Sequence, residues 1–330
     1  MGSALNLSLT TIDSDVIQHV TKTSSGCTVR SYSHDTGSGP VLCMVHGYPQ
    51  SSYMYILSFS QPARAERSRW RHVVPMLKDK FSMFAPELPG YGISSLPAKS
   101  DKRTVGGILM EALQSVFGKE RSIIWCSHDR GARVGHRLAV DNKPEHKIIA
   151  AIFMDIVPTA EQWRVFANPA AAVAYYHWPF LAGPTAPQLI EAMGGRVYCQ
   201  DNLNRSKGAN EAGAARLREN DAVDHYCTLF DKAETISGSC ADYAAGAFED
   251  VVEQEKDQQA GRKVTVPTMV IYSKKNLGRM HDVEGVWKKW VDGDLRGEAI
   301  PNGYGHYLPE ECPEEVAKLV LDFAGNYAKQ

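Results

Sequence analysis

The sequence predicts an α/β fold in which helices flank a mostly parallel sheet. Short, uninterrupted apolar runs recur along the 330-residue chain, and segments with a helical pattern lie between them. Uninterrupted apolar runs are typical of strands that are buried on both faces, as they are in a parallel sheet. Because strand and helix alternate, the pattern favours an α/β arrangement over separate helical and strand regions. The hydrophobic share of 43% is enough for a large core.

The expected elements follow in chain order. Runs with the composition of buried strands occupy residues 41–45, 81–85, 122–126, 148–155 and 268–273, and a shorter run spans 297–301. Helical patterns occupy residues 105–117, 130–141 and 313–328. The last of these carries apolar residues spaced to form one helix face, at Val316, Leu319, Val320, Leu321 and Phe323.

The strand pattern stops between residues 158 and 261, where the sequence offers helices but no convincing strand. We therefore expect an all-helical cap inserted after the sixth strand of the sheet. This divides the chain into a first part of the core (1–158), the cap (159–260) and a second part of the core (261–330). A polar stretch at residues 56–69 is expected to be a surface loop insertion.

The composition of the chain argues against nucleic acid and membranes as partners. The net charge of −2 does not favour nucleic acid or an anionic membrane, and no apolar run approaches the length of a membrane span. The seven cysteines are scattered and show no metal-ligand spacing, so buried, reduced thiols are expected. No metal-binding motif or phosphate-binding glycine loop is present. We expect a cytoplasmic protein without metal or cofactor that acts on a small molecule.

The most informative segment is Ser127-His128-Asp129-Arg130-Gly131. It joins the apolar run 122–126 to the helical pattern 130–141, and small residues stand two positions either side of Asp129. A strand, a tight turn and a helix in this order form a nucleophile elbow, which holds the central side chain clear of the backbone. A carboxylate is ionised at neutral pH and attacks an sp³ carbon without a base to deprotonate it. Asp129 at this position predicts displacement at carbon rather than serine esterase chemistry.

A second turn can complete an oxyanion hole. His46-Gly47-Tyr48-Pro49-Gln50 follows the predicted strand 41–45. A glycine-bearing turn at this place can direct the Tyr48 backbone N–H at the space above Asp129. Together with the Arg130 N–H, it would stabilise the negative oxygen of an ester intermediate.

A base and its supporting acid are expected from late positions. Gly303-Tyr304-Gly305-His306 follows the run 297–301, which places His306 where it can activate water against an aspartyl ester. His281 is the competing histidine. Asp155, at the end of the run 148–155, is the leading candidate for the acid that orients the imidazole, and Asp282 is the alternative.

These motifs, in this order, resemble the α/β-hydrolase superfamily, in its epoxide hydrolase and haloalkane dehalogenase branch. Within the branch the chain most resembles the fluoroacetate (haloacetate) dehalogenases, over nearly its whole length. The most specific segments are HDRGARVGHRL (128–138), MDIVPT (154–159), AYYHW (174–178) and SGSCADYAAG (237–246). The departures are Ser127, where glycine is usual, the loop at 56–69, and a poor match over 184–220 that leaves substrate size open.

The resemblance implies roles for further residues. Arg130 and Arg133 would hold a substrate carboxylate, because guanidinium groups suit it. His177, Trp178 and Tyr243 would surround a departing halide, although Tyr175, Tyr176 or Tyr226 could serve in place of Tyr243. The resemblance also supports Asp155 as the orienting acid and implies a possible homodimer.

Three hypotheses of function follow. The first is a cofactor-free, haloacid dehalogenase-like hydrolase that forms a covalent ester on Asp129 and hydrolyses it with water activated by His306. The second is an epoxide hydrolase with the same Asp-His-Asp triad, in which cap tyrosines protonate the epoxide oxygen. The third, from another class, is a ligand receptor or a non-hydrolytic cyclase or isomerase on the same scaffold.

Overall fold

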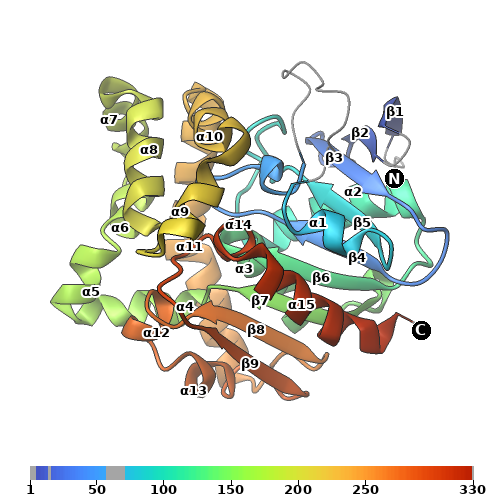
Figure 1. Cartoon of the computed structure of the whole chain (residues 1–330). Helices are drawn as coiled ribbons and strands as arrows, with labels where there is room; N and C mark the ends of the chain where they lie inside the picture. The colour runs from blue at the N-terminus through green and yellow to red at the C-terminus, as the bar shows by residue number, and fades with distance from the viewer. Residues whose placement is uncertain (1–4, 14–15, 57–70, 329–330) are drawn as a thin grey trace.

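The computed structural model describes residues 5–13, 16–56 and 71–328 and has one sheet with helices around it (Figure 1). Within these residues the sheet has nine strands in the order β1-β2-β3-β5-β4-β6-β7-β8-β9. The pairs β1/β2, β2/β3 and β3/β5 are antiparallel, and every other neighbouring pair is parallel. The predicted α/β class with a mostly parallel sheet is confirmed.

The parallel strands lie where the apolar runs predict them, with ends that differ by one or two residues. They are β4 (Val41–Val45), β5 (Ser82–Pro86), β6 (Ile123–His128), β7 (Ile148–Met154), β8 (Thr268–Ser273) and β9 (Leu295–Ile300). Because parallel strands share a direction, their carboxyl ends meet at one edge of the sheet, where α/β proteins bind ligands. The segments that follow β4, β6, β7, β8 and β9 therefore converge.

Three N-terminal strands were not predicted from the sequence. They are β1 (Leu5–Asp13), β2 (Val16–Lys22) and β3 (Thr28–His34). In β2 buried and less buried positions alternate, since one face is covered, and the polar His19 and Thr21 are among its buried residues. A run of mixed polarity gives a weaker strand signal than an apolar one. The helical insertion was expected to follow the sixth strand, and in the structure it follows the seventh, β7.

Helices outside the insertion support the sheet. They are α1 (Val74–Leu77), α2 (Lys102–Phe117), α3 (Asp129–Asp141), α12 (Leu277–Met280), α13 (Val283–Trp287), α14 (Leu308–Glu311) and α15 (Pro313–Ala324). Helix α2 packs against α3, and α1 contacts α15. Asp101 caps α2 by accepting from the Thr104 N–H at 3.0 Å, and Gly118 ends it with φ 79°. The predicted final helix, 313–328, ends at Ala324 and continues as a 3₁₀ turn.

Between β7 and β8 the chain is helical, as predicted. The helices are α4 (Thr159–Arg164), α5 (Pro169–Ala174), α6 (His177–Ala182), α7 (Ala186–Met193), α8 (Gly195–Ser206), α9 (Glu211–Arg218), α10 (Ala222–Phe230) and α11 (Ala233–Gln259). We call residues 159–260 the helical insertion. Its helices gather at one end of the sheet, at the left of Figure 1. The predicted loop at 56–69 lies outside the described residues, apart from Ile56.

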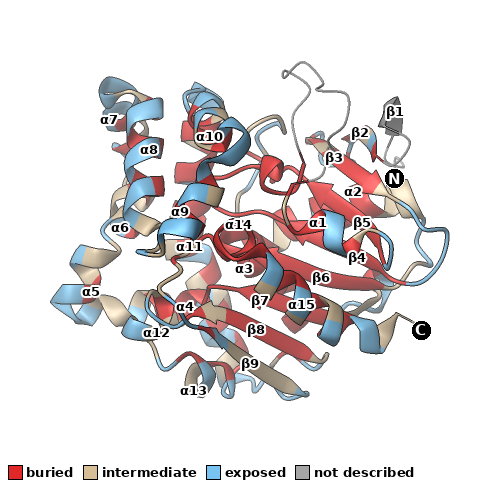
Figure 2. Ribbon diagram, in the orientation of Figure 1, coloured by how far each residue is buried: buried red, intermediate tan, exposed pale blue. Residues whose placement is uncertain are grey.

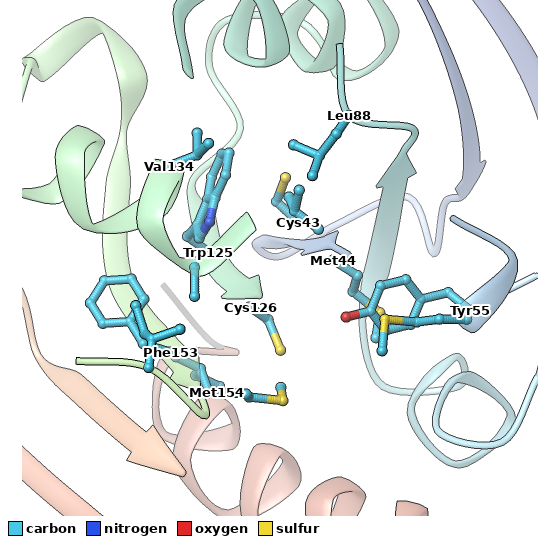
Figure 3. Packing of buried hydrophobic residues seen from close by; sticks show 14 of the residues in the cluster. Cys43, Met44, Tyr55, Leu88, Trp125, Cys126, Val134, Phe153 and Met154 are labelled. Carbon is cyan, nitrogen blue, oxygen red and sulfur yellow. The ribbon is translucent and has the colours of Figure 1, made fainter. Parts of the chain in front are cut away.

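The core fills the space between sheet and helices, and the central strands β4 to β8 are almost wholly buried (Figure 2). Trp125 and Phe153 lie on one face of the neighbouring strands β6 and β7, and Cys126 and Met154 lie on the other, so the core covers both faces of the sheet (Figure 3). All seven cysteines are free and buried, as expected. No helix among the described residues is long and apolar enough to cross a membrane.

Candidate active site

The turn between β6 and α3 has the strained geometry of a nucleophile elbow. Asp129 is buried and has a φ of 45°, a left-handed conformation that is uncommon for residues other than glycine. A Cβ on Gly131 would lie 2.6 Å from the carbonyl oxygens of Val45 and His46. A Cβ on Gly47 would lie 2.5 Å from the Asp129 Cβ. Glycine at 47 and 131 therefore lets the two turns touch.

The Asp129 carboxylate faces a backbone donor. The Tyr48 N–H donates to Asp129 Oδ2 at 2.9 Å, which is the contact expected of one arm of an oxyanion hole. The Arg130 amide, the other predicted arm, lies in the same turn, 3.1 Å from where a Gly47 Cβ would stand. Burial alone would raise the pKa of Asp129, but His306 and the nearby arginines outweigh it and hold the pKa well below its ordinary value. The carboxylate is therefore ionised.

His306 lies between two carboxylates. Its Nδ1 is 2.7 Å from Asp155 Oδ2, and its Nε2 is 3.9 Å from Asp129 Oδ1, which is longer than a hydrogen bond. Because an ionised carboxylate only accepts, Nδ1 carries the hydrogen toward Asp155 and Nε2 faces Asp129. Asp155 has a φ of 53° and also accepts from the Ser273 N–H at 2.8 Å and from Asn276 Nδ2 at 3.2 Å.

The competing residues lie elsewhere. Asp282 is exposed and caps α13 by accepting from the Gly285 N–H at 3.1 Å. The His281 ring is 6.4 Å from the Tyr175 ring, and burial lowers the His281 pKa to about 4. The structure thus brings Asp129, Asp155 and His306 together and leaves Asp282 and His281 out of the group.

The protonation of His306 depends on its neighbours. Burial disfavours a charge on the imidazole, but the carboxylates of Asp129 and Asp155 outweigh burial and raise the His306 pKa above its ordinary value. Any reaction that neutralises Asp129 removes one of these two charges. The pKa of His306 must then fall. More of the imidazole is then neutral at neutral pH and able to accept a proton.

The loop that carries His306 is fastened to the helical insertion. The His306 N–H donates to the Ser206 carbonyl, at the end of α8, at 2.9 Å. The buried Glu311 carboxylate accepts from the N–H groups of Gly208 (2.8 Å), Gly305 (2.8 Å) and Tyr307 (3.1 Å). A Cβ on Gly208 would stand 2.3 Å from the Gly303 carbonyl oxygen. We call this contact between residues 206–208 and 303–307 the seam.

Three predicted halide-binding side chains come together above Asp129. The rings of His177 and Trp178 lie 5.9 and 5.4 Å from the Tyr243 ring. Nδ1 of His177 is buried without a hydrogen-bond partner among the described residues, and burial lowers the pKa of this ring to about 3, so the imidazole is neutral. Burial also keeps Tyr243 protonated, because it raises the phenol pKa. Of the alternatives, Tyr226 instead donates to Glu310 at 2.9 Å, while Tyr175 joins the same cavity wall.

The two arginines have different surroundings. Arg130 donates from Nε to Asp242 Oδ2 at 2.5 Å and from Nη2 to the Asp242 carbonyl at 2.9 Å. Its Nη1 is buried and has no partner in the part of the chain that the structure describes. Arg133 lies over the Trp178 ring at 4.4 Å and donates from Nη1 to the Val157 carbonyl at 3.0 Å. Burial, with Arg130, lowers the pKa of Arg133 to about 10, so the guanidinium remains charged at neutral pH.

These side chains surround a cavity of about 260 Å³. Its lining includes Asp129, Asp155 and His306, the donors His177, Trp178 and Tyr243, and Arg133. Arg130 is not among the lining residues and stands behind Tyr243, whose ring centre is 4.1 Å from its Cζ. The structure therefore places Arg133, and not Arg130, at the cavity surface.

Some residues of the site were not found from the sequence. Asp242 pairs with both Arg130 and Lys102, and Asn276 contacts Asp155. Asp242 directly precedes Tyr243 in the segment 237–246, so its position could have marked it as a site residue. No feature of the sequence pointed to Glu311, because a glutamate is ordinarily a surface residue. Within the described residues no group of three or more His, Cys, Asp or Glu side chains is placed to hold a metal ion.

Comparison with known proteins identifies the family. Residues 44–319 match the model of the alpha/beta hydrolase family. The chain belongs to this family. It is accordingly an enzyme of the α/β-hydrolase superfamily, and the resemblance seen in the motifs is confirmed at this level.

Individual relatives narrow the comparison. The chain is 28% identical to a fluoroacetate dehalogenase from Burkholderia sp., covering 87% of this chain and 88% of the relative. It is 26% identical to a soluble epoxide hydrolase from Corynebacterium sp. (strain C12), covering 87% and 91%. A crystal structure from Nostoc sp PCC 7120, provisionally described as an alpha/beta hydrolase, superposes with a TM-score of 0.79 at 30% identity and covers 94% of this chain and 98% of that one.

Proposed function

We propose that this protein is a cofactor-free hydrolase that uses Asp129 as a nucleophile, most specifically a dehalogenase of small haloacids. The observation that carries the proposal is the ionised Asp129 carboxylate, presented on a strained elbow at the floor of the cavity and facing His306. In this proposal residues 1–158 and 261–330 form the core and the helical insertion forms a cap over the site.

In the first step Asp129 attacks the carbon that bears the halogen. A bond forms between a carboxylate oxygen and that carbon, and the carbon–halogen bond breaks. Neutral His177, Trp178 and Tyr243 are N–H and O–H donors in an apolar wall, which suits a small departing anion. Arg133 holds the substrate carboxylate from the cavity surface, and Arg130 contributes its positive charge from behind Tyr243.

In the second step water hydrolyses the ester. Formation of the ester removes the negative charge of Asp129, so the His306 pKa falls and Nε2 can accept a proton from water. Asp155 stabilises the resulting imidazolium through Nδ1. The Tyr48 N–H stabilises the oxygen that becomes negative when water adds to the ester carbonyl.

An epoxide hydrolase is the second candidate, favoured by a separate observation. Tyr175 and Tyr243, both from the helical insertion, line the cavity together with Asp129. Two phenols opposite a carboxylate nucleophile can protonate the oxygen of an opening epoxide. Arg133 on the same wall favours an anionic substrate, which is why the haloacid is proposed first.

A labelling experiment tests the mechanism. A single turnover in heavy-oxygen water with enzyme in excess is expected to give product without solvent label, because the product oxygen comes from Asp129. The label should appear in the peptide that contains Asp129 and should reach the product only in later turnovers. Solvent oxygen in the first product would overturn the proposal. Halide release from chloroacetate, measured beside diol formation from styrene oxide, separates the two substrate classes.

A further inference from the structure

The cavity continues beyond the groups that the proposed reaction uses. Its volume of about 260 Å³ equals roughly nine water molecules at about 30 Å³ each. A two-carbon haloacid placed against Asp129 would leave most of that space to water. The remaining lining includes Gln162, Tyr175 and Arg279 in addition to Arg133. This wall is polar and positively charged.

The cations of this wall are the buried Arg133 and the exposed Arg279, and among the described residues neither has a carboxylate oxygen within 4.0 Å. The Arg279 side chain makes no hydrogen bond to any of these residues. The other rim arginine, Arg205, differs, since it has Asp201 at 3.7 Å and donates to Asn202 Oδ1 at 2.6 Å. Arg279 and Arg133 both act on the phenol of Tyr175, which puts Tyr175 within electrostatic reach of both.

Two buried donors of the cavity lining have no acceptor among the residues that the structure describes. Gln162 is 2% exposed and lines the cavity, yet its Nε2 has no hydrogen-bond partner. Arg133 is 3% exposed, and its Nε is equally unpartnered. A buried donor on a cavity wall takes its acceptor from water or from a ligand, so these two groups can receive a ligand oxygen. A single substrate carboxylate on the Arg133 guanidinium leaves Arg279 without an anion.

We propose that Gln162, Tyr175 and Arg279, beyond Arg133 in the same cavity, bind a second acidic group, so that the substrate is a haloacid with two carboxylates. The inference rests on the proposed function and specifies its substrate class. The reaction is unchanged: Asp129 bonds to the halogen-bearing carbon, halide leaves with the bonding electrons, and water hydrolyses the ester to a hydroxy diacid. One carboxylate binds Arg133, and the other extends toward Arg279.

Matched substrates test the inference. 2-Chlorosuccinate and 2-chlorobutanoate have the same carbon chain and differ in one terminal carboxylate. We expect the wild-type enzyme to release halide from 2-chlorosuccinate with a kcat/KM at least about tenfold higher, because a charge-assisted hydrogen bond is gained. Arg279→Gln should lower kcat/KM for the diacid about tenfold and change that for the monoacid less than about twofold. Arg279→Lys should recover part of the loss.

Lys275→Gln is the control, because it removes an exposed neighbouring charge outside the cavity lining. It should leave both substrates unaffected. If halide is released from both acids without preference and Arg279→Gln changes neither, the second subsite is wrong and the proposed function stands. If no acid yields halide, calorimetry with succinate decides: binding that weakens about tenfold in Arg279→Gln supports the subsite while the proposed function fails. No succinate binding overturns the subsite.

Discussion

The elbow and the His306 loop are built in different ways. Asp129 is fixed by the core alone, since its turn lies against the end of β4 and the start of α3. Gly131 donates its N–H to the His46 carbonyl at 3.0 Å, so the two core turns are also bonded to each other. The backbone of the nucleophile is therefore held by contacts within the core.

The His306 loop, by contrast, is shared between core and insertion. On the core side, His128 Nε2 donates to the His306 carbonyl at 2.7 Å, and Ser273 Oγ donates to the Tyr304 carbonyl at 2.5 Å. On the other side the seam joins the loop to Ser206 and Gly208. The position of the nucleophile thus depends on the core, whereas the position of the base depends on the insertion as well. Four predictions test this difference between the elbow and the His306 loop.

The largest effect is expected for Asp129→Asn. Asparagine keeps the shape and tolerates positive φ, but a neutral amide is a poor nucleophile. Halide release in a single turnover should fall by about 10⁴-fold, while thermal unfolding changes little because the turn is intact. Activity that appears slowly on incubation, with a mass gain of one unit at residue 129, would indicate hydrolysis of the amide back to aspartate. Immediate full activity would contradict the role of this carboxylate.

Asp155→Asn should act on the second step. Loss of this carboxylate removes one of the charges that raise the His306 pKa, so the pKa falls. The rising limb of the pH–rate profile for ester hydrolysis should move to lower pH, since neutral imidazole then forms at lower pH. Its plateau should fall by about 10³-fold because the imidazolium is no longer stabilised. A burst of one halide per site, followed by a slow phase, is the measurement. A rising limb that moves to higher pH would contradict the role assigned to Asp155.

A matched pair of glycine substitutions compares the two regions directly. In Gly131→Ala the new methyl group meets two core carbonyl oxygens at 2.6 Å, so the free energy of unfolding should drop by about 3 kcal/mol. In Gly208→Ala it meets the Gly303 carbonyl oxygen at 2.3 Å, across the seam. The seam can open without unfolding the core, so this variant should lose activity with a smaller loss of stability in urea. Equal loss of stability in both variants would mean that core and seam form one rigid unit.

The smallest effect is expected for Glu311→Gln. A glutamine amide offers one acceptor oxygen where the carboxylate accepts three N–H groups at the seam. Ester hydrolysis should slow about tenfold while the first halide release keeps its rate, which burst kinetics would resolve. Glu314→Gln, at an exposed pair with Arg216, is the control and should change neither rate. A parallel loss in both steps would show that Glu311 supports the fold rather than the loop.

The sequence predicted the parallel part of the fold and the positions of the main site residues. Runs such as 41–45 and 268–273 are buried on both faces, so apolarity alone located β4 and β8. The strands β1 to β3 were missed because the described positions of β2 mix buried and less buried residues. Asp129 was predictable because a strand, a turn and small flanking residues are local features.

Partners across the fold were not predictable in the same way. The pairing of Arg130 with Asp242 joins residues 112 positions apart, and its consequence is that Arg130 stands behind the cavity wall. The amides of Gly208 and Gly305 meet at Glu311 only because α8 ends beside the loop that follows β9. Spacing in one sequence carries no information on such contacts.

The tight approach of Gly208 to residues 303–305 has a consequence for chimeric enzymes. A recombination breakpoint at the C-terminal end of the helical insertion would take residues 206–208 from one parent and the loop around Gly305 from the other. Any residue larger than glycine at 208 brings a methyl group against the backbone of that loop. Grafts that aim to change specificity should therefore carry both stretches from a single parent, together with Glu311.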